Sequence, residues 1–185
     1  GEKLDPQQVI SARDAAVAVR DSNLDDKYLR YAAYFAVEVW DLLAEEGFDA
    51  HKKATCNPSV GLPVIESPLD EPGDACRPES TKESREHRRI WVRSVPDVVV
   101  QQLRERDDYA ARVPESADVD KNAPTFRVQV ADTLFLYGRF EEATPRFERI
   151  WRENCGKNDA GFDAWYRLVV MSNLREDTQR SLYLV

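Results

Sequence analysis

The chain has 185 residues, of which 42% are hydrophobic and 10% aromatic, so it has enough apolar material for a folded core and is too apolar for a disordered chain. Its net charge of −8 disfavours nucleic acid or anionic lipid as the main partner. No stretch approaches the roughly 18 consecutive apolar residues of a transmembrane helix, and no signal peptide is recognisable. Gly1 without a Met, and the apolar residues Leu182–Val185 at the other end, predict a segment excised from a longer protein.

Two helices are predicted at the beginning of the chain. Asp5 and Pro6 favour a helix start, because Asp caps free backbone amides and Pro fits the first turn. This first helix is expected to end at Asp21–Asn23. A second helix, over about residues 25–46 with Gly47 as its C-terminal cap, is apolar on more than one face. We therefore expect the second helix to be sandwiched between neighbours.

Residues 52–90 interrupt the helical pattern as a long insertion that is rich in proline and glycine and has Cys56 and Cys76 near its ends. Long irregular segments are uncommon in compact domains and often carry function, although a mobile surface loop fits the composition equally well. The stretch 60–65 could be a short extended piece, but its prolines and glycines argue against a sheet. We therefore expect no clear strand in the chain.

Five more helices are predicted after the insertion, which makes the expected fold all-α with about seven helices in a single domain over residues 1–185. Pro96 opens the first of the five, which ends near Val113–Pro114. The others are expected at about 125–137, at 140–154, at 160–173 and from Arg175 onward.

A tight helical hairpin is predicted over residues 131–150. Ala131 and Ala143 supply small side chains where the two backbones approach, and Gly138 relaxes the backbone at the turn. Phe140 and Phe147 fill the space between adjacent helical pairs. One such pair cannot bury all its apolar surface alone, so the hairpin indicates stacked pairs.

This spacing resembles the tetratricopeptide repeat (TPR), with three departures. Arg127 lies where a large apolar residue is usual, and Cys155 lies where a proline usually closes the repeat. Pro145 falls early in the second helix and should bend it or restrict it to its first turn. The resemblance implies an α–α superhelix, or solenoid, in which one recognisable repeat is flanked by degenerate ones. It also implies a function in binding other proteins or peptides.

The order of the elements is, more loosely, similar to that of the envelope TPR proteins of myxobacteria and their relatives, some of which are tied to gliding motility. That similarity implies a protein–protein interaction scaffold in the periplasm or at the outer membrane. The cytoplasm is the alternative location if the protein is not exported. In a TPR stack the first helices line the concave face. By this resemblance, the predicted groove residues are Thr125, Val128, Asp132, Phe135 and Arg139.

Two pairs of residues in or next to the insertion are candidates for covalent or metal chemistry. A disulfide between Cys56 and Cys76 would close a loop of about 20 residues and add about 3 kcal/mol of stability, which suits an exported protein. Two reduced thiols are the alternative, with Cys155 expected to pack at a helix end. His51 and His87 would complete a set of four zinc ligands, but neither pair has the close spacing of structural zinc sites, so no metal is predicted.

Catalysis is not predicted, and neither is a cofactor. No local pattern places a Ser or Cys beside a His and a carboxylate, and the adjacent carboxylates diverge by about 100° on their helices. The sequence therefore predicts a non-catalytic protein-interaction scaffold. The alternatives are a metal-binding or enzymatic module within residues 51–87, or a purely structural spacer.

Overall fold

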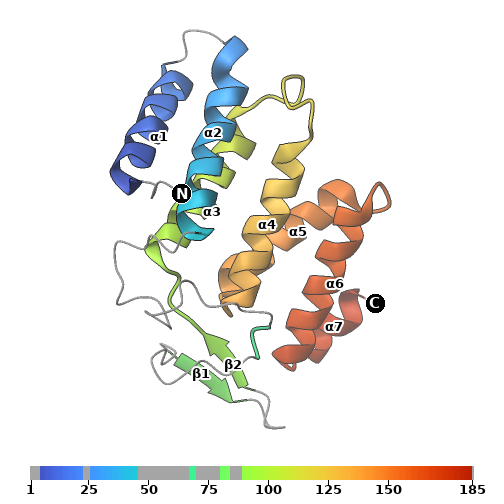
Figure 1. Cartoon of the computed structure of the whole chain (residues 1–185). Coiled ribbons are helices and arrows are strands. Elements are labelled where there is room, and N and C mark those ends of the chain that lie inside the picture. The colour runs from blue at the N-terminus through green and yellow to red at the C-terminus, as the bar shows by residue number, and fades with distance from the viewer. Residues whose placement is uncertain (1–4, 23–25, 46–66, 70–79, 84–88, 185) are drawn as a thin grey trace. The chain divides into compact units, whose positions relative to one another are not determined.

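The computed structural model describes residues 5–22, 26–45, 67–69, 80–83 and 89–184. These residues are all-α apart from one two-stranded hairpin (Figure 1). The chain falls into two compact units. The first unit is Gly1–Pro63 with Val95–Phe126, and the second unit is Val64–Ser94 with Arg127–Val185. A single domain over 1–185 stays a prediction.

Three helices build the first unit: α1 (Pro6–Asp21), α2 (Asp26–Glu45) and α3 (Asp97–Arg112). α2 packs against both α1 and α3, as expected for a helix that is apolar on more than one face. The Asp5 side chain accepts a hydrogen bond from the Gln7 amide at 2.9 Å, which confirms the predicted start of α1. A buried cluster between α2 and α3 includes Ala33, Val37 and Tyr109.

The start of α4 (Asn122–Leu136) is fixed by a buried carboxylate. Asp118 accepts hydrogen bonds from the amides of Asn122 at 3.0 Å and Ala123 at 2.8 Å. The Tyr109 hydroxyl donates to the same carboxylate at 2.8 Å. Asp118 therefore satisfies free amides at the helix start and ties them to α3.

The second unit contains most of α4 together with α5 (Phe140–Asn154), α6 (Asp159–Leu174) and α7 (Thr178–Leu184). α6 packs against both α5 and α7. The five residues that define the predicted helical hairpin are all buried; these are Ala131, Gly138, Phe140, Ala143 and Phe147. Their burial is as expected, and their packing roles between stacked helical pairs stay a prediction.

Gly138 has a further role that its place in the turn does not predict. Its φ of 72° lies in the left-handed region, and a Cβ there would lie 2.3 Å from the carbonyl oxygen of Trp91. Trp91 belongs to β2 (Arg89–Val92), which pairs antiparallel with β1 (Ser80–Glu83), with Ser80 opposite Val92. The glycine thus lets the strand approach the α4–α5 turn.

The buried residue Arg93 holds the β1–β2 hairpin to the turn between α4 and α5. Its amide donates to the carbonyl of Tyr137 at 2.9 Å, and its guanidinium Nη1 donates to the carbonyl of Leu136 at 3.1 Å. These bonds satisfy carbonyls at the C-terminal end of α4, which a helix leaves without internal partners.

One sequence prediction is wrong, and one of the two alternatives for Pro145 is excluded. The chain does contain strands, and the high β-propensity of Ile90, Trp91 and Val92 favours the second of them. The sequence does not predict them because strands of four residues are too short to show an alternating apolar pattern. Pro145 does not restrict α5 to its first turn, because the helix continues to Asn154, and a bend at Pro145 stays a prediction. Both Pro145 and Glu141, whose carbonyl loses its helical partner, are exposed, so water can satisfy that carbonyl.

Candidate functional site

The five predicted groove residues do not belong to one unit. Thr125 lies in the first unit, where it is exposed and its hydroxyl donates to the carbonyl of Lys121 at 3.3 Å. The other four lie in the second unit; these are Val128, Asp132, Phe135 and Arg139. Val128 is partly exposed.

Within the second unit, Arg167 contacts both Asp132 and Phe135. Its Nε donates to Oδ1 of Asp132 at 2.8 Å, and its guanidinium lies 4.7 Å from the centre of the Phe135 ring. Burial raises the pKa of Asp132, although the Arg167 charge acts to lower it. Phe135 is only 3% exposed and stacks on Phe140. Both side chains thus have internal partners, and ligand binding by them stays a prediction.

Arg139 lies at the start of α5, where its Nε donates to Glu142 at 2.7 Å. It also lines a cavity of about 220 Å³. The other residues around this cavity are Ile90, Val92, Gly138, Phe140, Glu141, Glu142 and Arg175. Because both signs of charge are present in the lining, the cavity does not select a ligand of one charge.

The residues considered for a disulfide or a metal lie mostly outside the described part of the chain. This applies to Cys56, Cys76, His51 and His87. Cys155 lies at the C-terminal cap of α5, as expected, but it is exposed rather than packed. Among the residues with described positions, no three His, Cys, Asp or Glu side chains gather closely enough to hold a metal ion.

A larger and more apolar hollow lies in the first unit between α1 and α2. Its volume is about 490 Å³. It is lined by Gln8, Val9, Ala12, Phe35, Glu38, Val39 and Leu42. Five of these seven side chains are apolar, and Phe35 is 42% exposed although it is a large aromatic residue. We call this hollow the α1–α2 groove.

The sequence of α1 explains why the groove is uncovered. Alanine and valine occur around the whole helix instead of on one face. In the structure, Arg20 is the one side chain of α1 that is buried. α1 therefore has apolar residues that α2 does not cover, including Val9 and Ala12 in the groove and Val19, which is 49% exposed.

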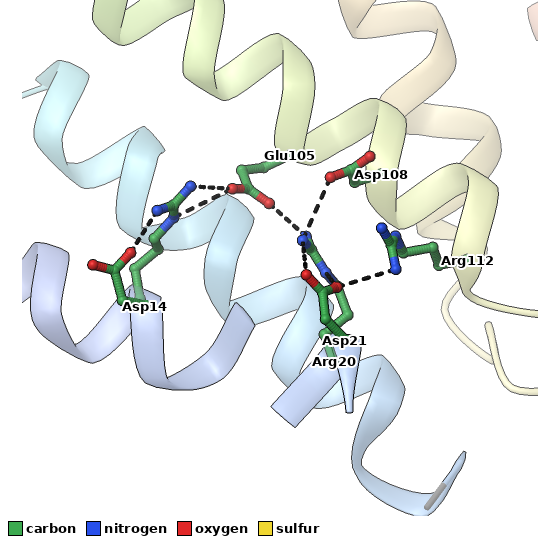
Figure 2. A network of polar contacts seen from close by, with 7 residues as sticks. Asp14, Arg20, Asp21, Glu105, Asp108 and Arg112 are labelled. Atoms are coloured by element: carbon green, nitrogen blue, oxygen red, sulfur yellow. Dashed lines mark hydrogen bonds and ion pairs between the residues drawn. The ribbon is translucent and has the colours of Figure 1, made fainter. Parts of the chain in front are cut away.

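Charged residues hold α1 to α3 (Figure 2). Glu105 of α3 is 3% exposed and accepts from Nη1 of Arg20 at 2.7 Å and from Nη2 of Arg13 at 2.7 Å. Arg20 also pairs with Asp21 at 2.8 Å and lies 3.5 Å from Asp108. The buried guanidinium thus keeps three carboxylates around it, which offsets part of the cost of its burial.

The network shifts the pKa values of Arg13, Arg20 and Asp21 in the direction of their charged forms. Burial alone would lower the pKa of Arg20, but its hydrogen bonds to Asp21 and Glu105 raise it above its usual value. The hydrogen bond from Arg20 lowers the pKa of Asp21. Sequence reasoning missed these residues because isolated charges on helices are usually solvated. The available signal was that Arg13 and Arg20 are seven residues apart, on one face of a helix otherwise rich in alanine.

No protein-family model, curated protein or solved structure shows a significant match to this chain. None of the helices with described positions is both long and apolar enough to cross a membrane.

Proposed function

We propose that this chain is a non-catalytic protein-interaction scaffold and that it binds a partner protein in the α1–α2 groove. The observation that carries the proposal is the uncovered apolar lining of that groove, with Phe35 exposed at its side. Exposed apolar hollows of this kind mark contact surfaces, because burying them against a partner removes apolar area from water.

The proposal includes a TPR-like stacking of the helical pairs. It is supported by the burial of Ala131, Ala143 and Phe147, and by the left-handed φ of Gly138 at the turn, where the resemblance implies a glycine. A place in a bacterial envelope assembly rests on the sequence resemblance. Fractionation of cells that make the protein tests that place.

A photo-crosslinking amino acid at Phe35 tests the function directly in cells, with the same amino acid at Phe162 as the control. Phe162 is also exposed, at 63%, but belongs to the second unit. We expect a protein adduct at position 35 that is absent at position 162. The identified partner should also bind the purified chain, and Phe35→Asp should weaken that binding at least about tenfold because it places a charge in an apolar contact.

Two results would count against the proposal. A partner that binds purified Phe35→Asp as tightly as the unchanged chain would place the contact elsewhere. No adduct at position 35 would favour a structural spacer, or a site within residues 51–87, most of which lie outside the described part of the chain.

A further inference from the structure

Both helices that flank the α1–α2 groove carry side chains at alternating spacings of three and four residues. On α1 these are Val9, Ala12, Ala16 and Val19. On α2 these are Tyr28, Tyr31, Phe35, Glu38 and Leu42. Five members of the two stripes line the groove. Alternating spacings of three and four describe the seam along which a further helix packs.

Side chains along these two stripes are more exposed than they would be if a further helix packed on them. Tyr28 is 52% exposed, Tyr31 is 65% exposed and Val19 is 49% exposed, although each is a large apolar or aromatic residue. Small side chains at Ala12 and Ala16 leave room for another helical backbone to approach α1. The α1 stripe runs over eleven residues from Val9 to Val19, a rise of about 15 Å, which corresponds to about three turns of a partner helix.

Glu38 indicates the charge of that helix. It is the one charged residue lining the described groove, it is exposed, and it makes no ion pair with any residue whose position is described. It occupies a seam position on α2, where a polar residue selects partners instead of adding apolar contact. A Lys or Arg facing Glu38 would be favoured, and the net charge of −8 adds to the attraction for a basic partner.

We propose that the α1–α2 groove binds an amphipathic α-helix of a partner protein, with apolar residues at alternating spacings of three and four and a Lys or Arg facing Glu38. This inference rests on the proposed function and adds the secondary structure and the charge of the partner segment. The same negative charge argues against an anionic membrane surface as the occupant.

Two synthetic peptides test the inference against the whole chain. Each is an 18-residue helix-forming peptide with leucine at the seam positions and one central seam position that is Lys in the first peptide and Glu in the second. Binding is followed by fluorescence anisotropy at low and high salt. The protein variants are Glu38→Lys and, as the control with the same change in net charge, Glu115→Lys. Glu115 is exposed in the same unit and lies outside the groove.

We expect the unchanged chain to bind the Lys peptide about tenfold more tightly than the Glu peptide, with a smaller ratio at high salt. Glu38→Lys should reverse the preference, and Glu115→Lys should keep it. Ala12→Phe, at an exposed helical position, should weaken both peptides because it fills the groove.

Three results would overturn the inference. If both peptides bound equally well and Ala12→Phe weakened the binding of both, the groove would be an apolar site that does not select a basic helix. Binding of neither peptide, combined with a successful crosslink at position 35, would mean a partner that is not helical. A concentration-dependent dimer that Ala12→Phe abolishes would mean that a second copy of this chain fills the groove.

Discussion

The buried charge network of the first unit leads to a sharp prediction about Glu105→Leu. The carboxylate and the Arg20 guanidinium are each about 4% exposed on their side chains and lie 2.7 Å apart. Removing one partner of a buried pair typically costs about 3–5 kcal/mol, because the other charge stays buried without it. Arg20 keeps Asp21 at 2.8 Å, so we expect the lower end, about 3 kcal/mol.

Two companion variants separate two free energies: the cost of leaving one charge buried without its partner, and the net contribution of the ion pair to stability. Arg20→Met should also cost about 3 kcal/mol, because it leaves Glu105 buried with only Arg13 as a close partner. The double variant Arg20→Met/Glu105→Leu removes both buried charges and replaces them with apolar side chains. We expect it to lie within about 1 kcal/mol of the unchanged chain, so that the coupling energy, the sum of the two single costs less the cost of the double variant, is about 5 kcal/mol.

Urea unfolding followed by circular dichroism measures these free energies. Hydrogen exchange of peptides from α1 and α3 assigns the transition to the first unit. Glu115→Leu is the control, since that side chain is exposed and should change stability by less than about 0.5 kcal/mol. The reasoning would be refuted if Glu105→Leu cost less than about 1 kcal/mol, or if the double variant were as unstable as the sum of the two single variants.

Three further variants test other parts of the fold. Gly138→Ala should cost at least about 2 kcal/mol, because the left-handed φ and the close carbonyl of Trp91 both oppose a Cβ; an unchanged melting temperature would contradict this. Tyr109→Phe should cost about 1–3 kcal/mol in urea unfolding, since buried Asp118 loses a donor. In Asp21→Asn the loss of stability should be present at pH 6 and shrink as the pH falls below about 3.8, because a lowered pKa in the folded state contributes stability only above the unfolded value. A gap in melting temperature that persisted at pH 2 would argue against that assignment.

Local sequence signals were sufficient for the helices. Asp5 and Pro6 located the start of α1, because a cap acts within one turn of its own helix. The two-faced apolar pattern of α2 predicted that it lies between neighbours, which its contacts with α1 and α3 confirm. These features depend on residues close together in the chain.

The features that escaped prediction depend on residues far apart in the chain. Asp118 caps α4 from outside the helix while it holds Tyr109 of α3, so neither residue shows its role in its own segment. Arg20 and Glu105 are 85 residues apart, and each resembles an ordinary solvated helix charge until the helices meet. The apolar stripes of α1 and α2 were visible in the sequence, but only packing distinguishes a covered stripe from an uncovered one.

The charge network and the α1–α2 groove are linked through α1. Arg20 is the one buried side chain described in α1, so its ion pairs add to the packing of α1 on α2, while the apolar residues in the groove remain available to a partner. Glu105→Leu should therefore loosen α1 and abolish binding of the Lys peptide, although Glu105 does not line the groove. The double variant Arg20→Met/Glu105→Leu should restore that binding, because apolar contacts replace the ion pairs and hold α1 again. If the double variant were stable but still did not bind, the network would have to act on the groove through more than the attachment of α1.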